Sequence, residues 1–254
     1  MLRTDAHSAT ENTGEEDTEE LIMARKTVRQ LIRDCGRKKK ITLEGDPGCR
    51  ISGVTSDSRK VSPGMLFAAL RGSLSDGHNF IAEALKKGAA AVLTDREVHS
   101  SGTIVLRTNA PADCFGHLLH GFHDFPALKL ECIGITGTNG KTTTAEFIRH
   151  LYRTMGKKPG LIGTLGYDTG KNRYPPSTTT PGAEEMCGLM REMIENNVDV
   201  MIAEVSSHAL DQERCSGILF DAAVFTNISR DHLDYHQTMH AYKTAKSKLF
   251  EQIK

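Results

Sequence analysis

Cys132-Ile133-Gly134-Ile135-Thr136-Gly137-Thr138-Asn139-Gly140-Lys141-Thr142-Thr143-Thr144 joins a short apolar run to a glycine-rich turn and then to an amphipathic segment. This order is typical of a strand, a phosphate-binding loop and a helix. Gly137 and Gly140 let the backbone turn tightly and direct its N–H groups at an anion, and the positive end of the helix adds to the field. Lys141 is suited to neutralising terminal phosphates, and Thr142 to offering its hydroxyl to Mg²⁺. The segment therefore predicts a loop that binds nucleotide phosphate.

The loop departs from the strict phosphate-loop pattern, because Ile135 stands where that pattern requires its first glycine. The spacing is a shorter variant, Gly-Thr-Asn-Gly-Lys-Thr. The alternative interpretation is a glycine-rich turn with an incidental lysine. The expected strand and helix on either side favour the phosphate loop.

The composition limits the number of domains and the classes of partner that this protein can have. A chain of 254 residues is long enough for one large or two ordinary domains. Its 32 basic and 32 acidic residues cancel, so no overall field indicates nucleic acid or an anionic membrane as a partner. The six cysteines are scattered without a Cys-x-x-Cys pair, which indicates reduced thiols in a cytoplasmic protein. No apolar run approaches the ~20 residues of a membrane helix.

The hydrophobic pattern predicts an α/β protein with two domains. Residues 1–22 are acidic and lack a hydrophobic period, so we expect a disordered tail. Residues 23–108 alternate strands and helices in a small α/β domain, and residues 109–130 form a connecting helix. Residues 131–254 are expected to form a doubly wound, mostly parallel phosphate-loop domain.

Within these domains, several elements carry candidate ligands. Residues 111–128 read as one helix, on which His117, His120 and His123 favour a polar face over a metal site because no acidic or thiol partner stands nearby. Residues 161–167 read as one strand. The hydroxyl run at residues 178–180 suits a helix N-cap, or donors to a ligand anion.

Two further strands deliver polar residues to the expected sheet edge. The strand at residues 198–204 ends in Glu204, and because ligands lie at the carboxyl ends of such strands, this carboxylate is expected near the loop and its metal. A charge that only ends a strand is the alternative. The strand at residues 220–226 is expected to be buried and leads to His232 and His236, which would share a helical face. His232 is a candidate ligand for a second Mg²⁺, or a hydrogen-bonded structural histidine.

Together these blocks resemble the Mur ligases of peptidoglycan synthesis. The resemblance is carried by residues 137–143, by Glu204-Val205-Ser206-Ser207-His208-Ala209-Leu210 and by residues 224–236. The first block is shared with the wider ligase superfamily, including folylpolyglutamate synthetases. The other two are similar to the ligases that add the third amino acid to UDP-N-acetylmuramoyl-L-alanyl-D-glutamate. Residues 56–72, with Asp76-Gly77-His78, resemble the family's UDP-sugar-binding domain.

The resemblance implies an ATP-dependent amide ligase that uses Mg²⁺ and an acyl-phosphate intermediate. Its substrates would be the UDP-N-acetylmuramoyl-dipeptide and an amino acid, diaminopimelate or lysine. The implied ATP-binding residues are Gly137, Thr138, Asn139, Gly140, Lys141, Thr142 and Thr143. The implied catalytic residues are Lys141, Glu204, His232 and Lys246. The implied metal ligands are Thr142, Glu204, His232 and Lys246 as a carbamate. The implied substrate contacts are Ser58, Thr179, Thr180, Ser206, Gln212 and Arg214.

Two groups of these residues also have a purely structural interpretation. From composition alone, the residues around Ser58 also read as an ordinary polar turn, and Lys243 and Lys248, near Lys246, as solvated positions on a basic helix.

The family also has a further part of the central domain and a C-terminal domain that binds the amino acid, and both are expected in cis beyond Lys254. The rival interpretations are a non-catalytic muropeptide-binding remnant, another amide ligase of the superfamily, and a phosphate-loop NTPase.

Overall fold

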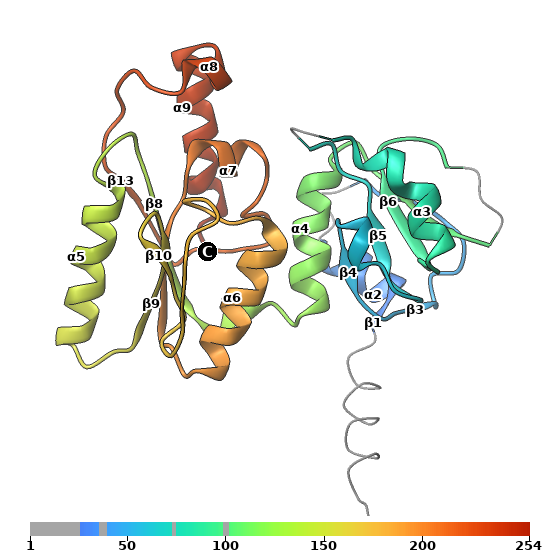
Figure 1. Ribbon diagram of the computed structural model, residues 1–254, viewed down its shortest axis with the longest axis horizontal. Coiled ribbons are helices and arrows are strands. Elements are labelled where there is room, and N and C mark those ends of the chain that lie inside the picture. The colour runs from blue at the N-terminus through green and yellow to red at the C-terminus, as the bar shows by residue number, and fades with distance from the viewer. Residues whose placement is uncertain (1–25, 36–39, 73–74, 99–101) are drawn as a thin grey trace, which may run out of the picture.

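The computed structural model describes residues 26–35, 40–72, 75–98 and 102–254, which form two α/β bodies with helix α4 (Pro111–Phe122) between them (Figure 1). The predicted acidic tail lies outside the described residues. Within those ranges no helix is both long and apolar enough to cross a membrane.

The N-terminal body is a five-stranded sheet with helices packed on it. Its elements are β1 (Lys26–Thr27), α2 (Val28–Asp34), β2 (Thr42–Glu44), β3 (Arg50–Ile51), β4 (Val54–Thr55), the 3-10 helix η1 (Ser58–Lys60), β5 (Leu66–Ala68), the 3-10 helix η2 (Gly77–Phe80), α3 (Ile81–Lys86), β6 (Ala91–Thr94) and β7 (Ile104–Arg107). The strand order is β2-β7-β6-β5-β4, and only β2 pairs antiparallel. The short strands β1 and β3 form a separate antiparallel pair.

Helix α4 is shorter than the predicted helix at residues 111–128. Asp124 and Phe125 have φ values of 56° and 51°, which a helix cannot continue through, and the 3-10 helix η3 (Pro126–Lys129) follows. The prediction of a polar histidine face is also wrong at its centre, because His120 is fully buried. This face of α4 packs against the loop at Gly217, where an added Cβ would lie 3.0 Å from the His120 ring.

The C-terminal body holds the predicted phosphate-loop domain. Its elements are β8 (Glu131–Thr136), α5 (Lys141–Thr154), β9 (Pro159–Gly163), β10 (Gly166–Asp168), β11 (Arg173–Tyr174), α6 (Ala183–Glu195), β12 (Val200–Glu204), α7 (Ser207–Asp211), β13 (Ala222–Phe225), α8 (Leu233–His236), α9 (Met239–Ser247) and the 3-10 helix η4 (Lys248–Gln252). Six strands are ordered β11-β10-β9-β12-β8-β13, and the last four are parallel.

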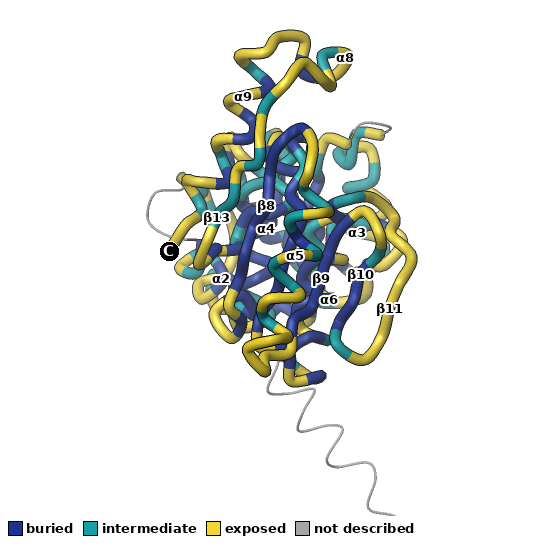
Figure 2. Tube along the Cα trace, turned by 90° about the vertical axis from the view of Figure 1, so that its left-hand side faces the viewer, coloured by how far each residue is buried: buried dark blue, intermediate teal, exposed yellow. Residues whose placement is uncertain are grey.

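Helices cover both faces of this sheet, as the near-continuous apolar strands predicted. Ile133 and Ile202 pack on the side of α5, whereas Cys132 and Met201 pack on the side of α6. Figure 2 shows β8 and β9 buried almost throughout, and β11 exposed. The doubly wound, mostly parallel fold is therefore confirmed.

Three local predictions for this body are wrong. The single strand expected at residues 161–167 is a hairpin of β9 and β10, because the chain reverses at Thr164–Leu165. The strand β13 is an edge strand rather than a buried one, and Phe225 is 42 % exposed. Helix α6 starts after Gly182 without a side-chain cap, so the hydroxyls of residues 178–180 do not cap it.

Strand register brings three carboxyl ends to one edge. Glu204 of β12 lies opposite Ile135 of β8, and Phe225 of β13 lies opposite Thr136. The glycine-rich turn leaves β8 at this edge, which is where ligands bind in doubly wound sheets.

Candidate active site

The turn between β8 and α5 has a backbone that only glycine tolerates at its first position. Gly137 has a φ of 147°, and a Cβ added there would lie 1.9 Å from Thr226 Oγ1. Gly140 has a φ of 82° and precedes α5 directly. No side chain caps α5, so the N–H groups of its first turn are left for an anion.

Residues after β13 hold this turn in place. Asn227 accepts from the backbone N of Asn139 and donates to its carbonyl, both at 3.1 Å, and the Thr226 hydroxyl donates to the same carbonyl at 2.7 Å. Thr138 Oγ1 accepts from Ser229 N at 3.0 Å and lies 3.1 Å from the hydroxyl of Tyr242. The turn is thus fixed before any ligand arrives.

Lys141 lies over this turn. Its Nζ donates to the carbonyls of Gly137 and Thr138, each at 2.9 Å. Burial lowers the pKa of Lys141, while the charges of Glu204 and Asp231 oppose that change. A partly buried ammonium group beside free N–H groups suits a polyphosphate.

The carboxylate of Glu204 is fully buried next to the turn, where the strand pattern predicted it. Its Oε2 accepts from Thr142 Oγ1 at 2.8 Å and from Thr164 Oγ1 at 3.2 Å, and its Oε1 accepts from Thr164 N at 3.0 Å. A Cβ on Gly163 would lie 2.2 Å from Glu204 Oε1, so the neighbouring strand leaves room for the carboxylate. Carboxylate and hydroxyl oxygens are ligands that Mg²⁺ prefers, so these residues fit the predicted ion.

His232 lies in an aromatic cluster. It has a φ of 51° and precedes α8, so it is not on a helical face with His236. Its ring centroid is 4.9 Å from that of His208 and 6.0 Å from that of Tyr242. Across the described residues, no group of three or more His, Cys, Asp or Glu side chains is arranged as a metal site. The metal role of His232 stays a prediction.

Lys246 differs from its basic neighbours on and after α9. It is buried, and its Nζ donates to the carbonyl of Gly137 at 2.8 Å and lies 4.6 Å from the ring centroid of Tyr242. Burial, and then the charge of Lys141, lowers its pKa to about 8. Lys243 is exposed, and Lys248 pairs with Glu213 at 2.7 Å.

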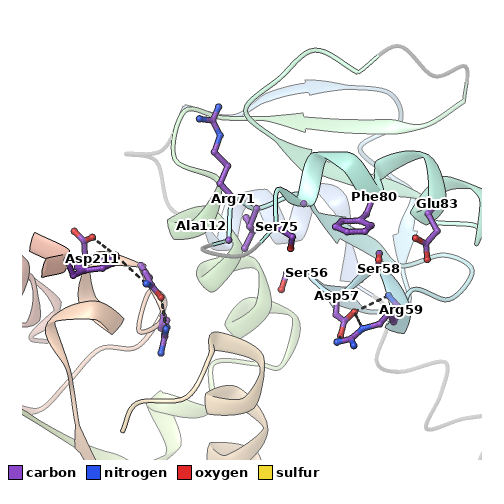
Figure 3. A pocket seen from close by; sticks show the side chains of 16 residues that line it. Ser56, Asp57, Ser58, Arg59, Arg71, Ser75, Phe80, Glu83, Ala112 and Asp211 are labelled. Atoms are coloured by element: carbon purple, nitrogen blue, oxygen red, sulfur yellow. Dashed lines mark hydrogen bonds and ion pairs between the residues drawn. The ribbon is translucent and has the colours of Figure 1, made fainter. Parts of the chain in front are cut away.

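A cleft of about 1020 Å³ lies between the two bodies. Ser58 and its neighbours from the loop after β4 line one side, and Asp211, Gln212 and Arg214 line the other (Figure 3). Tyr235 of α8 closes the second side and donates to Asp211 Oδ2 at 2.9 Å.

Hydrogen bonds connect this cleft to Glu204. Arg214 donates to Gln212 Oε1 and, through Nη1, to the carbonyl of Thr180 at 2.9 Å. Thr180 Oγ1 donates to the Glu204 carbonyl at 2.9 Å and accepts from Ser206 N at 3.0 Å. These bonds connect the predicted substrate residues of this body to Glu204. Thr179 is connected to Glu204 through Thr164, with the two threonine hydroxyl oxygens 3.3 Å apart. Of the other predicted metal residues, Lys246 bonds to Gly137, and His232 contacts the rings of His208 and Tyr242.

Sequence reasoning missed four residues at this site. Thr226 stands in an apolar run that indicates core, and Thr164 stands inside what reads as one strand. Tyr242 stands on what reads as a basic helix, and Asn227 follows directly after an expected strand. The only available signal was the position of Thr226 and Asn227 at the carboxyl end of a parallel strand.

Comparison with known proteins agrees with this geometry. Residues 135–254 match the profile of the Mur ligase middle domain, and residues 50–117 match that of the Mur ligase family catalytic domain. The chain is 42 % identical over 203 residues to the UDP-N-acetylmuramoyl-L-alanyl-D-glutamate–2,6-diaminopimelate ligase of Geobacillus kaustophilus, covering 80 % of this chain and 41 % of that protein. The ligase of the same name from Aquifex aeolicus is 43 % identical over 201 residues, covering 79 % and 42 %.

Solved structures show the same fold. A UDP-N-acetylmuramoyl-L-alanyl-D-glutamate–2,6-diaminopimelate ligase superposes with a TM-score of 0.70 at 28 % identity, covering 91 % of this chain and 46 % of that one. A structure of MurF from Acinetobacter baumannii superposes with a TM-score of 0.54 at 20 % identity, covering 91 % and 47 %. The chain therefore spans about two fifths of the length of the curated relatives that it matches.

Proposed function

The chain belongs to the Mur ligase family of ATP-dependent amide ligases, and from this premise we propose that it supplies the UDP-sugar-binding and ATP-binding parts of a ligase. The proposed ligase adds the third amino acid to UDP-N-acetylmuramoyl-L-alanyl-D-glutamate in peptidoglycan biosynthesis. The names of its relatives favour diaminopimelate over lysine as that amino acid. Because ATP is the phosphoryl donor, we propose a cytoplasmic enzyme.

One observation carries the proposal. The network from Arg214 through Thr180 to Glu204 links the interdomain cleft to the turn that holds Lys141 and Thr142. A substrate carboxylate entering from the cleft would meet the terminal phosphate of ATP beside Glu204. Such an arrangement serves phosphoryl transfer from ATP to a carboxylate, because the reaction consists mainly of positioning and charge neutralisation.

Amide formation from a carboxylate requires ATP and the substrate carboxylate to lie side by side. A carboxylate is a poor acyl electrophile because oxide is a poor leaving group, so transfer of the γ-phosphoryl group to it makes an acyl phosphate. The amine of the incoming amino acid then attacks the acyl carbon, phosphate leaves, and the amide forms. Lys141 and the N–H groups of the first turn of α5 would offset the repulsion between carboxylate and triphosphate. Mg²⁺, held by Thr142 and Glu204, would neutralise phosphate charge; His232 and carbamylated Lys246 are the proposed ligands of a second ion.

The substrate contacts follow from the two walls of the cleft. Ser58 would meet the uridine diphosphate end, and Gln212 and Arg214 the peptide end. Thr179, Thr180 and Ser206 would lie between the peptide and the nucleotide.

Titration calorimetry on the 254-residue chain tests the proposal. We expect binding of ATP with Mg²⁺ and, separately, of UDP-N-acetylmuramoyl-L-alanyl-D-glutamate. Lys141→Ala should abolish ATP binding, because it removes the ammonium group, and leave muropeptide binding intact. Undiminished ATP affinity in that variant would refute the phosphate-loop assignment.

A substrate panel separates the rival functions. Binding of folates in place of the muropeptide would make the chain another ligase of the superfamily. Phosphate release from ATP without any muropeptide would favour a phosphate-loop NTPase. Muropeptide binding without any ATP binding would leave a non-catalytic binding module.

A further inference from the structure

Glu184 connects the two bodies of the protein. It lies in the first turn of α6 in the C-terminal body, yet its carboxylate accepts hydrogen bonds from the end of β4 in the N-terminal body. Its Oε1 accepts from Ser56 N at 2.7 Å and from Ser56 Oγ at 2.8 Å, and Thr55 Oγ1 lies 3.2 Å from both carboxylate oxygens. Lys60 Nζ lies 3.4 Å from Oε2. One carboxylate thus binds a backbone N–H and two hydroxyls across the domain boundary.

The groups on either side of this contact belong to opposite walls of the cleft. Ser56 leads within two residues to Ser58, on the N-terminal wall. In the C-terminal body, Glu184 lies four residues after Thr180. The Thr180 carbonyl accepts a hydrogen bond from Arg214, which lines the second wall. A movement of Glu184 relative to Ser56 would therefore change the separation of the walls.

The other contacts across the boundary include the packing of α4 on the loop at Gly217 and contacts between apolar side chains. Ala183 and Cys187 of α6 pack into the core of the N-terminal body, next to Phe115 of α4. Apolar contacts are not directional, whereas a carboxylate that accepts three donors fixes both distance and orientation. The Lys60 pair adds little, because that lysine is mostly exposed.

We propose that Glu184 is an interdomain positioning residue that sets the width of the cleft for a ligand contacting both walls. The identity of that ligand, UDP-N-acetylmuramoyl-L-alanyl-D-glutamate, rests on the proposed function. The contact itself is independent of the ligand. Glu184 is not among the residues that line the cleft, and it acts through Ser56, which is.

Amide exchange at Ser56 tests the contact without any ligand. The Ser56 N–H donates to Glu184 Oε1, so Glu184→Ala should speed its hydrogen–deuterium exchange. Glu185→Ala is the matched control, since Glu185 lies in the same helical turn but accepts from Ser177 within its own body at 2.9 Å. Glu184→Gln should keep slow exchange, because its amide oxygen can still accept from Ser56. Unchanged exchange in Glu184→Ala would overturn the proposal.

Affinities for a long and a short ligand test the positioning role. Glu184→Ala should weaken binding of the UDP-muramoyl-dipeptide about tenfold, since a wall displaced by a fraction of an ångström loses its contacts. Binding of UDP alone and of ATP should not change, because each touches one body. Glu184→Gln and Glu185→Ala should match the wild type. Equal losses for UDP and the dipeptide, or no loss for either, would overturn the role. If the wild type does not bind the muropeptide, both the proposed function and the positioning role are refuted. The exchange rate of the Ser56 amide still tests whether Glu184 makes the interdomain contact.

Discussion

Thr142 Oγ1 donates to Glu204 Oε2 across 2.8 Å, although the two residues are 62 positions apart in sequence. One stands at the start of α5 and the other at the end of β12, so the bond joins the end of the glycine-rich turn to the neighbouring strand. Both atoms are oxygens of the kind that bind Mg²⁺. The proposed Mg²⁺ would be held by this pair.

Glu204→Gln should weaken the Mg²⁺-dependent part of ATP binding at least about tenfold, because a neutral amide oxygen is a poorer ligand than a carboxylate. Affinity for ATP in the presence of EDTA should not change. Since the amide can still bond to Thr164 and Thr142, we expect the free energy of unfolding to fall by only about 1 kcal/mol. Calorimetric titrations with and without Mg²⁺ measure the effect. Glu192→Gln, a carboxylate of α6 bonded to Thr169 and Tyr174, is the control. The same Mg²⁺ dependence in Glu204→Gln as in wild type would exclude this ligand.

Gly137→Ala should lower the free energy of unfolding by about 3 kcal/mol and abolish ATP binding, because its Cβ would overlap Thr226 Oγ1. Gly140→Ala is the comparison. Its φ of 82° costs about 1 kcal/mol in an L residue, but its Cβ would meet only Thr226 Cβ, at 4.0 Å. Urea unfolding measures both variants. Adding Thr226→Ala to Gly137→Ala should restore part of the loss, and equal stability of the two single variants would show that the close contact does not matter.

The parts of the site that sequence predicted are those that depend on local pattern. The turn from residue 137 to 142 follows from glycine positions and the flanking periods, and the place of Glu204 follows from a buried parallel strand that ends in a charge. Both are decided within about ten residues of chain. The structure places them together because their strands are neighbours.

The parts that sequence could not predict depend on distant contacts. Tyr242 reaches Thr138 across 104 positions, and Asn227 reaches Asn139 across 88. In the sequence, Tyr242 is one more aromatic residue on a helix. Glu184 reads as an acid that suits the first turn of a helix, and only packing of the two bodies shows its second partner. Burial also separates Lys246 from its neighbours, which the sequence alone does not distinguish.

Lys246 should form a carbamate with CO₂ more readily than other lysines. With a pKa of about 8, roughly one tenth of its amine is neutral at pH 7, against less than one in a thousand for an ordinary lysine. The neutral amine attacks the carbon of CO₂ and loses a proton, which gives an anion. The carbamate should increase as the pH rises from 7 through 8. Carbon NMR with labelled bicarbonate should show one carbamate signal that Lys246→Arg removes and Lys243→Arg keeps. A signal that survives Lys246→Arg would assign the carbamate elsewhere.

His120 should make the protein sensitive to acid. Burial lowers its pKa to about 4, and in the described residues neither ring nitrogen has a hydrogen-bond partner. The unfolded chain, with an ordinary histidine pKa near 6.5, therefore binds more protons between pH 4 and 6.5. The contribution of neutral His120 to stability is complete above pH 6.5 and is lost as the pH falls to about 4, by about 3 kcal/mol in all.

His120→Leu should remove this part of the pH dependence, because leucine fills a similar volume and does not titrate. At neutral pH the variant should be at least as stable as wild type, since no hydrogen bond of the ring is lost. Burial also lowers the pKa of His123 to about 4, so the His120→Leu variant should keep the part of the pH dependence of stability that His123 causes. His120→Leu combined with His123→Gln should lose both. Urea unfolding at several pH values between 4 and 7 measures the slopes, and a slope that His120→Leu leaves unchanged would contradict the buried, neutral state of this histidine.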